Sequence, residues 1–236
     1  MNKLLIATNN QGKIKELHEL LDDLGIDLVT PAQIGLDLDV VEDGHTYAEN
    51  AAKKAVAFAH ASGLISLADD SGLEVDLLDG APGLYSARYG STNGERLSDA
   101  GRRQYLLSKL QGKPRPWTAH FHATIAIAIP HNHVLLPKGH RDDVSEAKDL
   151  SSHKETIWSP ENGSIRVTCV EGICPGEIIP EERGTGGFGY DPIFLLPELG
   201  MTMAELGMYE KNHLSHRARA VMNARGILEK LFSKIG

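Results

Sequence analysis

The sequence predicts an α/β fold, because segments with the periodicity of strands and of helices alternate from its first residues. An apolar run at residues 4–7 is typical of a buried strand. Residues 12–24 then carry apolar side chains at intervals of three and four, which predicts a helix ending at Gly25. A short strand at residues 27–30 follows, so strand, helix and strand succeed one another.

The next helix begins near Thr46 and ends by Gly63. Its start is marked by a capping box, since Glu49 stands three residues after Thr46. Residues 64–68 form another short apolar run, which predicts a buried strand. The polar residues 69–72 directly after it predict a turn that ends this strand.

The second half of the chain continues the alternation. We expect a helix over about residues 95–110, a long strand over 118–129, and one or two strands over 165–179. Residues 202–205 repeat the capping-box spacing, and a last helix is expected over 215–232. These elements predict a mixed sheet flanked by helices.

Composition narrows the class of protein. The chain has 236 residues, of which 41% are hydrophobic and 24% charged, and its net charge is −8. An acidic chain is poorly suited to coating nucleic acid, and no apolar run approaches the roughly 18 residues of a membrane span. Cys169 and Cys174 have neither redox nor zinc spacing, and the first eight residues do not resemble a secretory leader. We therefore expect a cytoplasmic protein with neither nucleic-acid nor membrane partners.

We expect one domain over residues 1–236, because the chain has no clear linker or internal repeat. Residues 130–163 stand apart from this pattern, with many charges and little periodicity. They are expected to form an insertion or a long loop that contains a short element.

The first candidate site follows the first strand. It is the run Thr8, Asn9, Asn10, Gln11, Gly12 and Lys13. Free N–H groups at a helix start and the charge of Lys13 suit an anion such as phosphate, although the run lacks the Walker A pattern. An ordinary polar connection is the alternative.

The second candidate is the pair Asp69 and Asp70. Adjacent acids at the end of a buried strand are costly unless they are paired or bind a cation, and Mg²⁺ takes oxygen ligands of this kind. Glu42 or Asp43 could add a carboxylate. The alternative is a solvated turn.

The third candidate is the glycine-rich run at residues 184–189. It matches G-x-G-x-x-G but follows charged residues and precedes Asp191-Pro192, so it is not a dinucleotide-binding turn. Phe188 could stack on a planar base and Asp191 could accept a hydrogen bond. Alternatively, the aromatic residues of this loop fill the core.

The fourth candidate is the run Ser215, His216 and Arg217, with Lys211 four residues before Ser215. These donors could bind phosphates or the edge of a base. A catalytic Ser-His pair and a simple helix cap are the competing interpretations.

In this order the motifs resemble the non-canonical purine nucleoside triphosphate pyrophosphatases, the inosine triphosphate pyrophosphatase family. The resemblance covers nearly the whole chain. It rests on T-x-N-x-G-K at 8–13, E-D-G at 42–44, E-N-A at 49–51, K-A at 54–55, A-D-D-S-G-L at 68–73, A-P-G-L-Y-S-A-R at 81–88, the run 184–194, and Lys211 with S-H-R at 215–217.

The resemblance implies an elongated mixed β-sheet with two lobes and a central substrate cleft, usually in a homodimer. It implies hydrolysis of ITP, dITP and XTP to the monophosphate and pyrophosphate with Mg²⁺. Asp70 would be the general base and, with Glu42 and the neighbouring Asp69, would hold the metal. Substrate would be bound by Thr8 to Lys13, Lys54, Ser71, Arg88, Phe188, Gly189, Tyr190, Asp191, Lys211, His216 and Arg217.

Two features depart from the family pattern. Ala218 stands where the family usually has glycine, and residues 130–163 exceed the usual strand connection. Two other functions stay open. A related pyrophosphatase could act on modified pyrimidine or methylated nucleotides, and a non-enzymatic module could bind nucleotides through the same pocket.

Overall fold

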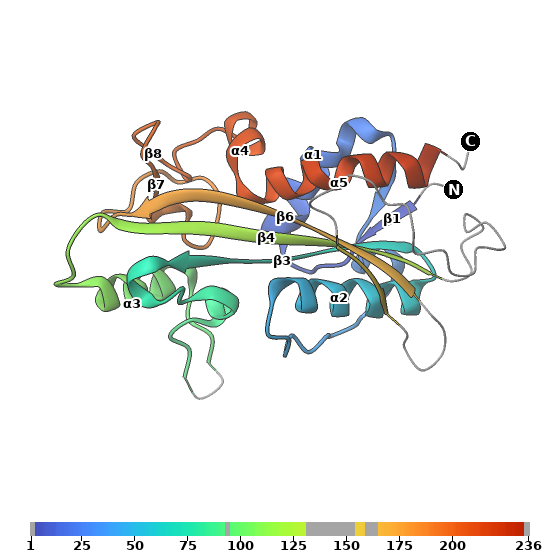
Figure 1. The fold of residues 1–236 in the computed structure, drawn as a ribbon, viewed down its shortest axis with the longest axis horizontal. Coiled ribbons are helices and arrows are strands. Elements are labelled where there is room, and N and C mark those ends of the chain that lie inside the picture. Colours follow the sequence, from blue (N-terminus) through green and yellow to red (C-terminus); the bar gives the residue numbers. More distant parts are fainter. Residues whose placement is uncertain (1–2, 93–94, 131–153, 159–164, 234–236) are drawn as a thin grey trace. The chain divides into compact units, whose positions relative to one another are not determined.

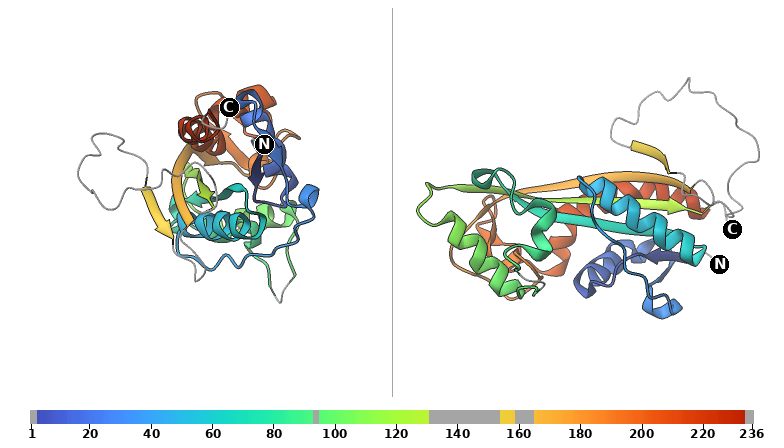
Figure 2. Two further views of the ribbon diagram at one scale, coloured as in Figure 1. Left: turned by 90° about the vertical axis from the view of Figure 1, so that its right-hand side faces the viewer. Right: turned by 90° about the horizontal axis from the view of Figure 1, so that it is seen from below.

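The computed structural model describes residues 3–92, 95–130, 154–158 and 165–233. They form a mixed β-sheet with helices packed against it (Figures 1 and 2), which confirms the predicted α/β class. The strand order is β2-β1-β3-β4-β6-β7-β8, and β5 pairs with β6. The strands are β1 Lys3–Ile6, β2 Asp27–Val29, β3 Ile65–Val75, β4 Trp117–Ile129, β5 Lys154–Trp158, β6 Ile165–Ile178, β7 Phe194–Leu196 and β8 Met201–Thr202. The α-helices are α1 Gln11–Leu21, α2 Tyr47–Ser62, α3 Asp99–Leu110, α4 Met208–Leu214 and α5 His216–Phe232.

The chain divides into two compact units, each built from separate segments. Unit 1 contains Met1–Asp70, Thr124–Glu171 and Val221–Gly236, and unit 2 contains Ser71–Ala123 and Gly172–Ala220. Strands β3, β4 and β6 and helix α5 each contribute residues to both units. The expectation of one domain over residues 1–236 stays a prediction.

In unit 1, β1 pairs in parallel with β2 on one side and with β3 on the other. Right-handed crossovers therefore place α1 and α2 on opposite faces of the sheet, as Figure 1 shows. Helix α2 is rich in alanine. Its buried Ala55 and Ala59 belong to the same core cluster as Leu5 and Ala68 of the sheet. Small side chains allow a close approach of helix and sheet.

The ends of the unit 1 helices follow the predicted capping. Thr46 Oγ1 accepts a hydrogen bond from the Glu49 N–H at 3.1 Å, which closes the first turn of α2. Gly63 and Gly25 have φ angles of +68° and +63°. Glycine adopts this left-handed conformation without penalty, so Gly63 ends α2 and Gly25 ends the 3₁₀ helix Asp22–Leu24 that follows α1.

The part of α5 in unit 1 is tied to its neighbours by two side chains. The Arg225 guanidinium donates to both Asp23 carboxylate oxygens at 2.8 and 2.6 Å. Asn223 Nδ2 donates to the Glu171 carbonyl at 2.8 Å. These bonds join the last helix to the end of α1 and to β6.

Unit 2 has a core of apolar side chains from α3, β4 and the antiparallel strands β6 and β7. Strand β6 and the start of α5 approach each other closely at Gly172. A Cβ atom on Gly172 would lie 2.3 Å from both the Ala220 nitrogen and the His216 carbonyl oxygen. Only glycine fits between these backbones.

Two local predictions were wrong. Residues 69–72 form no turn, since β3 runs unbroken from Ile65 to Val75. Asp69 stays within the strand because its buried carboxylate forms an ion pair with Lys13, as described below. Residues 202–205 begin no helix. Glu205 Oε2 accepts from the Thr202 N–H at 2.7 Å, but this bond closes a turn after β8.

The other predicted elements agree with the structure to within a few residues, whereas β7, β8 and α4 were not predicted. Helix α3 begins at Asp99 rather than near residue 95, because Ser98 caps it through the Gly101 N–H. Residues 165–178 form the single strand β6. Within the predicted insertion, residues 131–153 and 159–164 lie outside the described residues, and β5 pairs antiparallel with β6. Among the described helices, none has the length and apolar character to cross a bilayer.

Candidate active site

The predicted site residues fall into two groups, one in each unit. The unit 1 group starts with the loop between β1 and α1. Asn10 caps α1, because its Oδ1 accepts from the Lys13 N–H at 3.0 Å, and Thr8 Oγ1 accepts from the Asn10 N–H at 3.2 Å. The side chains of Asn9, Asn10 and Gln11 are exposed. The polar loop at a helix N-terminus is thus formed as predicted, and it suits an anionic ligand.

Two lysines converge on Asp69 from different elements. Lys13 Nζ lies 2.6 Å from Asp69 Oδ1, and the Asp69 carboxylate is completely buried. Both Lys13 Nζ and Lys54 Nζ donate to the Asp69 carbonyl oxygen at 3.2 Å. The lysines are thereby fixed beside the strand, and their cost of burial is offset by the ion pair and these hydrogen bonds.

Asp70 and Glu42 place two carboxylates near these cations. Lys54 Nζ lies 2.5 Å from Glu42 Oε1. Burial raises the pKa of Asp70, and the negative charge of Glu42 raises it further, while Lys54, Lys13 and a hydrogen bond from Asn50 act in the opposite direction. A raised pKa in a polar cluster is typical of a functional carboxyl.

Asn50 is a member of this group that the sequence analysis did not assign to the site. It is 2% exposed, and its Oδ1 accepts from the Gly44 N–H at 2.8 Å. Its side chain also hydrogen bonds to Asp70. Asn50 therefore links the segment that carries Glu42 to the segment that carries Asp70. Asn50 is the middle residue of the E-N-A motif at residues 49–51, and that motif was the sequence signal that could have assigned it to the site.

The carboxylates of Glu42 and Asp70 suit a hard cation whose remaining coordination positions are filled by other ligands. Among the described residues, no group of three or more histidine, cysteine or acidic side chains is arranged to hold a metal. Mg²⁺ commonly binds one or two carboxylates and takes its remaining ligands from substrate phosphates and water. Glu42 and Asp70 match that donor set. Asp69 does not, because its carboxylate is fully buried against Lys13.

The unit 2 group centres on a buried ion pair. Lys211 Nζ lies 2.7 Å from Asp191 Oδ2, with side chains 5% and 6% exposed. The same carboxylate oxygen accepts from the Phe188 N–H at 3.0 Å. A Cβ atom on Gly187 would lie 2.0 Å from Asp191 Oδ2, and Gly187 has a φ of +71°. Glycine at this position lets the carboxylate reach both partners.

Two cations flank the Phe188 ring. Lys211 Nζ and Arg217 Cζ lie 5.4 and 5.6 Å from its centroid. Arg217 is 1% exposed and donates from Nη2 to Ser71 Oγ at 3.1 Å. An aromatic face beside cationic donors can stack on a base and hydrogen bond to its oxygen atoms.

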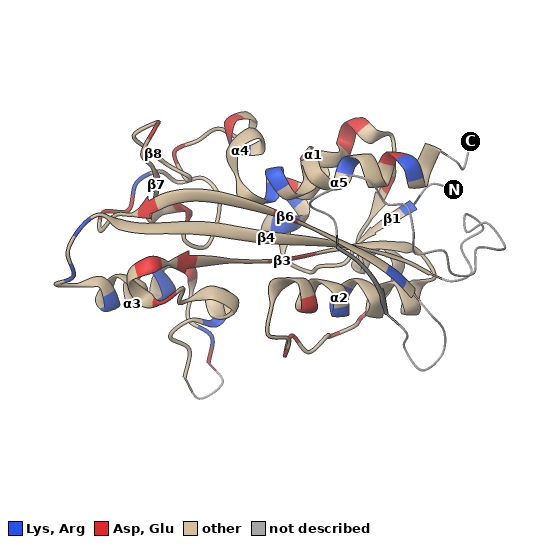
Figure 3. Cartoon of the chain, viewed as in Figure 1, with Lys and Arg blue, Asp and Glu red and all other residues tan. Residues whose placement is uncertain are grey.

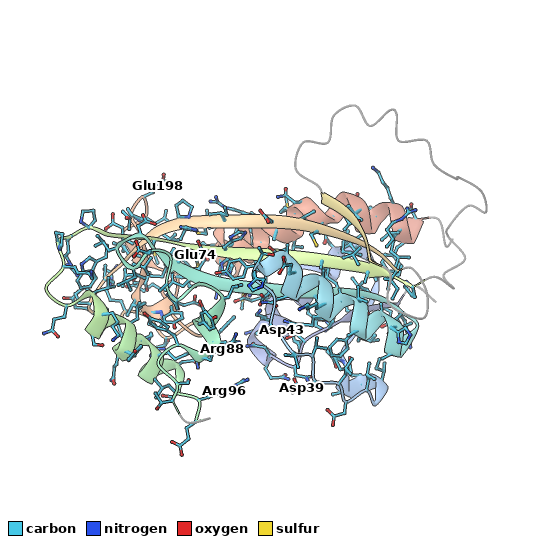
Figure 4. All side chains as sticks on the ribbon, turned by 60° about the horizontal axis from the view of Figure 1, so that its bottom comes forward. Asp39, Asp43, Glu74, Arg88, Arg96 and Glu198 are labelled. Atoms are coloured by element: carbon cyan, nitrogen blue, oxygen red, sulfur yellow. The ribbon has the colours of Figure 1, made fainter. Side chains whose placement is uncertain are left out.

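The remaining predicted residues of unit 2 are distributed around this centre. His216 stacks on Phe121 with a centroid distance of 4.7 Å. Tyr190 is buried in the core, its hydroxyl donates to the Ser86 carbonyl at 3.0 Å, and burial raises its pKa. Arg88, labelled in Figure 4, lies 5.0 Å over the Tyr85 ring.

Ser215 acts as a helix cap. Its Oγ accepts from the Ala218 N–H at 3.1 Å, which satisfies a free donor at the start of α5. This bond favours the cap over the catalytic Ser-His interpretation. Ala218 itself is fully buried.

The polar loop with the paired lysines and acids in unit 1 suits an anionic ligand, and the aromatic face beside cations in unit 2 suits a planar base; these are features typical of proteins that bind nucleotides. The chain belongs to the Ham1 family, whose sequence pattern matches residues 4–142 and 154–226.

Known relatives extend over almost the full chain. A protein named dITP/XTP pyrophosphatase from Desulforamulus reducens is 44% identical over 231 residues, which cover 98% of this chain and 97% of that protein. One of the same name from Bacillus subtilis is 39% identical over 230 residues, covering 97% and 98%. The structure of a HAM1 protein from Coxiella burnetii is 34% identical with a TM-score of 0.74, covering 98% and 100%.

Proposed function

We propose that this protein hydrolyses non-canonical purine nucleoside triphosphates (dITP, ITP and XTP) to the nucleoside monophosphate and pyrophosphate. The observation that carries the proposal is the convergence of Lys13 and Lys54 on Asp69, beside the carboxylates of Glu42 and Asp70. Full-length relatives named dITP/XTP pyrophosphatase support it. In the cell, this activity would remove deaminated purines from the nucleotide pool.

The triphosphate is assigned to the residues of unit 1. The N–H groups and side chains of Thr8 to Gly12 surround the helix start, where the helix dipole favours negative charge. Lys13 and Lys54 add full positive charges that are held by Asp69. Phosphoryl transfer depends mainly on positioning and charge neutralisation, which these groups provide in an acidic protein.

Glu42 and Asp70 are assigned as ligands of Mg²⁺. Asp69 affects the site indirectly, because its carboxylate holds Lys13 in place. When bound, Mg²⁺ would neutralise phosphate charge and acidify a water molecule. The donor set of two carboxylates beside a phosphate site supports this assignment.

Asp70 is also assigned the role of general base. The oxygen of a water molecule attacks the α-phosphorus while Asp70 accepts a proton from that water. The bond between the α-phosphorus and the oxygen that bridges to the β-phosphate breaks, and the electron pair of that bond leaves with pyrophosphate. The raised pKa of Asp70 brings its basicity closer to that of an effective proton acceptor at neutral pH.

The base is assigned to the residues of unit 2. Phe188 offers an aromatic face, and Lys211 and Arg217 offer donors to a 6-oxo group. A 6-amino group would place donor against donor and leave a buried group unpaired, which costs about 1–3 kcal/mol. Ser71, Arg88, Gly189, Tyr190, Asp191 and His216 are assigned supporting positions in this pocket.

We further propose a homodimer in the cytoplasm. Cys169 and Cys174 are both free thiols, as is usual in a reducing compartment. Light scattering after size-exclusion chromatography will measure the mass of the assembly against the chain mass of 25.6 kDa.

The decisive experiment measures pyrophosphate and orthophosphate released from dITP, XTP and dATP, with and without Mg²⁺. Pyrophosphate from dITP and XTP, but little from dATP, is the expected result. Orthophosphate would show that a different bond is broken. If dITP and XTP release nothing, the same assay with a modified pyrimidine nucleoside triphosphate and a binding measurement with ITP follow. Release from the pyrimidine substrate alone would favour the related pyrophosphatase, and tight ITP binding without release would favour a binding module.

A further inference from the structure

Helix α3 holds the peptide groups on both sides of Gly189. The Gly189 N–H donates to Asp99 Oδ2 at 2.6 Å, and the Gly189 carbonyl accepts from Arg103 Nη1 at 2.8 Å. Asp99 and Arg103 are four residues apart on α3, so they share one face of the helix. Figure 3 shows acidic and basic residues together on α3.

Arg103 also binds Glu182, which stands two residues before the glycine-rich run. Its Nε and Nη2 atoms donate to Glu182 Oε1 and Oε2 at 2.9 and 2.8 Å. These hydrogen bonds hold the pKa of Glu182 below its usual value. The Arg103 side chain is 11% exposed and that of Glu182 is 42% exposed, so the guanidinium of this bidentate pair is buried while the carboxylate still meets water. One guanidinium thus joins Glu182 to Gly189 and fixes both ends of the segment 183–188.

The segment that Arg103 fixes has little stiffness of its own. Three of its residues are glycines, at positions 184, 186 and 187, and so is the residue that follows it, Gly189. Glycine-rich backbone has many accessible conformations, so its order has to come from bonds to other elements. Phe188 shares a peptide group with Gly189, and its ring is the one flanked by Lys211 and Arg217.

We propose that Arg103, with Asp99 and Glu182, is a positioning residue that sets the base selectivity of this site by fixing Phe188. The proposal rests on the proposed function, in which Phe188 stacks on the base. Arg103 lies outside the group of residues assigned to the triphosphate and the attacking water. Its removal is therefore expected to weaken discrimination between bases more than it slows the bond-breaking step at saturating substrate.

The test compares Arg103→Gln and Arg103→Lys with Lys109→Gln as a matched control. Lys109 is an exposed cation on the same helix that contacts the Tyr105 ring. For Arg103→Gln we expect the ratio of kcat/KM for dITP over dATP to fall by about tenfold, with a raised KM and little change in kcat for dITP. Arg103→Lys keeps the charge but loses the bidentate geometry, so it should recover only part of the ratio. Lys109→Gln should match the wild-type protein.

Amide hydrogen exchange on the nucleotide-free protein provides a second readout. Arg103→Gln should accelerate exchange in residues 183–190 without changing the exchange of α2. An unchanged selectivity ratio, or unchanged exchange in this segment, overturns the proposal. Glu182→Gln supplies the test if Arg103→Gln does not fold. If the wild-type protein releases no pyrophosphate from dITP, the proposed function is wrong. The hydrogen-exchange result would still decide whether Arg103 fixes residues 183–188.

Discussion

The ammonium group of Lys13 lies 2.6 Å from a carboxylate of Asp69 that has no exposed surface. The pair joins the start of α1 to the middle of β3. It explains how the buried Asp69 remains inside a continuous strand, and it fixes the lysine that is assigned to the triphosphate. The first prediction tests this lysine.

Lys13→Ala is expected to raise KM for dITP with a smaller effect on kcat, because it removes charge that binds the phosphates in both ground state and transition state. Steady-state kinetics measure both parameters. Lys15→Ala is the control, since Lys15 is an exposed cation on the same helix. A loss confined to kcat would mean that Lys13 acts only in the transition state.

Asp70→Asn is expected to leave the fold intact and to reduce kcat by at least about 100-fold, the scale for losing a general base. The amide is similar in size to the carboxylate but accepts no proton. Asp43→Asn is the control, because Asp43, labelled in Figure 4, pairs with Lys53 and is assigned neither to Mg²⁺ nor to proton transfer. Turnover close to wild type in Asp70→Asn would refute the assignment.

Gly172→Ala is expected to destabilise unit 2 by several kcal/mol, because its methyl group would meet the backbone of α5 at 2.3 Å. Gly226→Ala is the matched control within α5, where an added methyl group meets nothing within 4 Å. Alanine should raise stability there by up to about 1 kcal/mol. Thermal and urea unfolding measure both effects, and equal stability of the two variants would contradict the packing described for β6.

The two thiols are expected to resist alkylation in the native protein. Burial raises the pKa of both Cys169 and Cys174 to about 11, so little thiolate forms at pH 8. Mass spectrometry after iodoacetamide treatment should find both cysteines largely unmodified in the native protein and fully modified in urea. Rapid native labelling of either would show that its surroundings are open to solvent.

The Asp23–Arg225 ion pair is expected to make a small, pH-dependent contribution to the free energy of unfolding. Arg225 holds the pKa of Asp23 below its ordinary value of 3.8. Stabilisation is therefore present above pH 3.8 and is lost as the pH falls through the lower, native-state pKa. Asp23 is mostly exposed, so Asp23→Asn should cost less than about 1 kcal/mol at pH 7. Urea denaturation should show the difference shrinking toward pH 3, and a difference that grows with acidity would contradict the ion pair.

Local signals were sufficient for much of the fold. Helix α2 was predictable at both ends because its cap residue Thr46 and its terminal Gly63 act within a few residues of their partners. The unbroken strand at Asp69 was not predictable, because its stabilising partner Lys13 is 56 residues away in sequence. A pair of acids followed by Ser-Gly has the local composition of a turn.

The site was predictable where its residues form compact motifs, and not where they act across the chain. Asp191 was expected to line the base pocket and Lys211 to bind phosphate or the edge of the base, but their ion pair was not expected. Asp99 and Arg103 have the appearance of ordinary surface residues on an amphipathic helix. Their shared partner Gly189 lies 90 and 86 residues away, so no sequence window contains both sides of the contact.

The division of the chain has a consequence for synthesis. Unit 1 begins with β1 and also needs Val221 onward, the portion of α5 that carries Arg225. Since a ribosome makes α5 after every other helix and strand described, neither unit is complete when only the first half of the chain has emerged. The apolar side chains of nascent β1 and α2 therefore stay exposed at least until β4 and β6, which share their core cluster, have been made, and chaperones that shield such surfaces have their longest opportunity to act on this protein during translation.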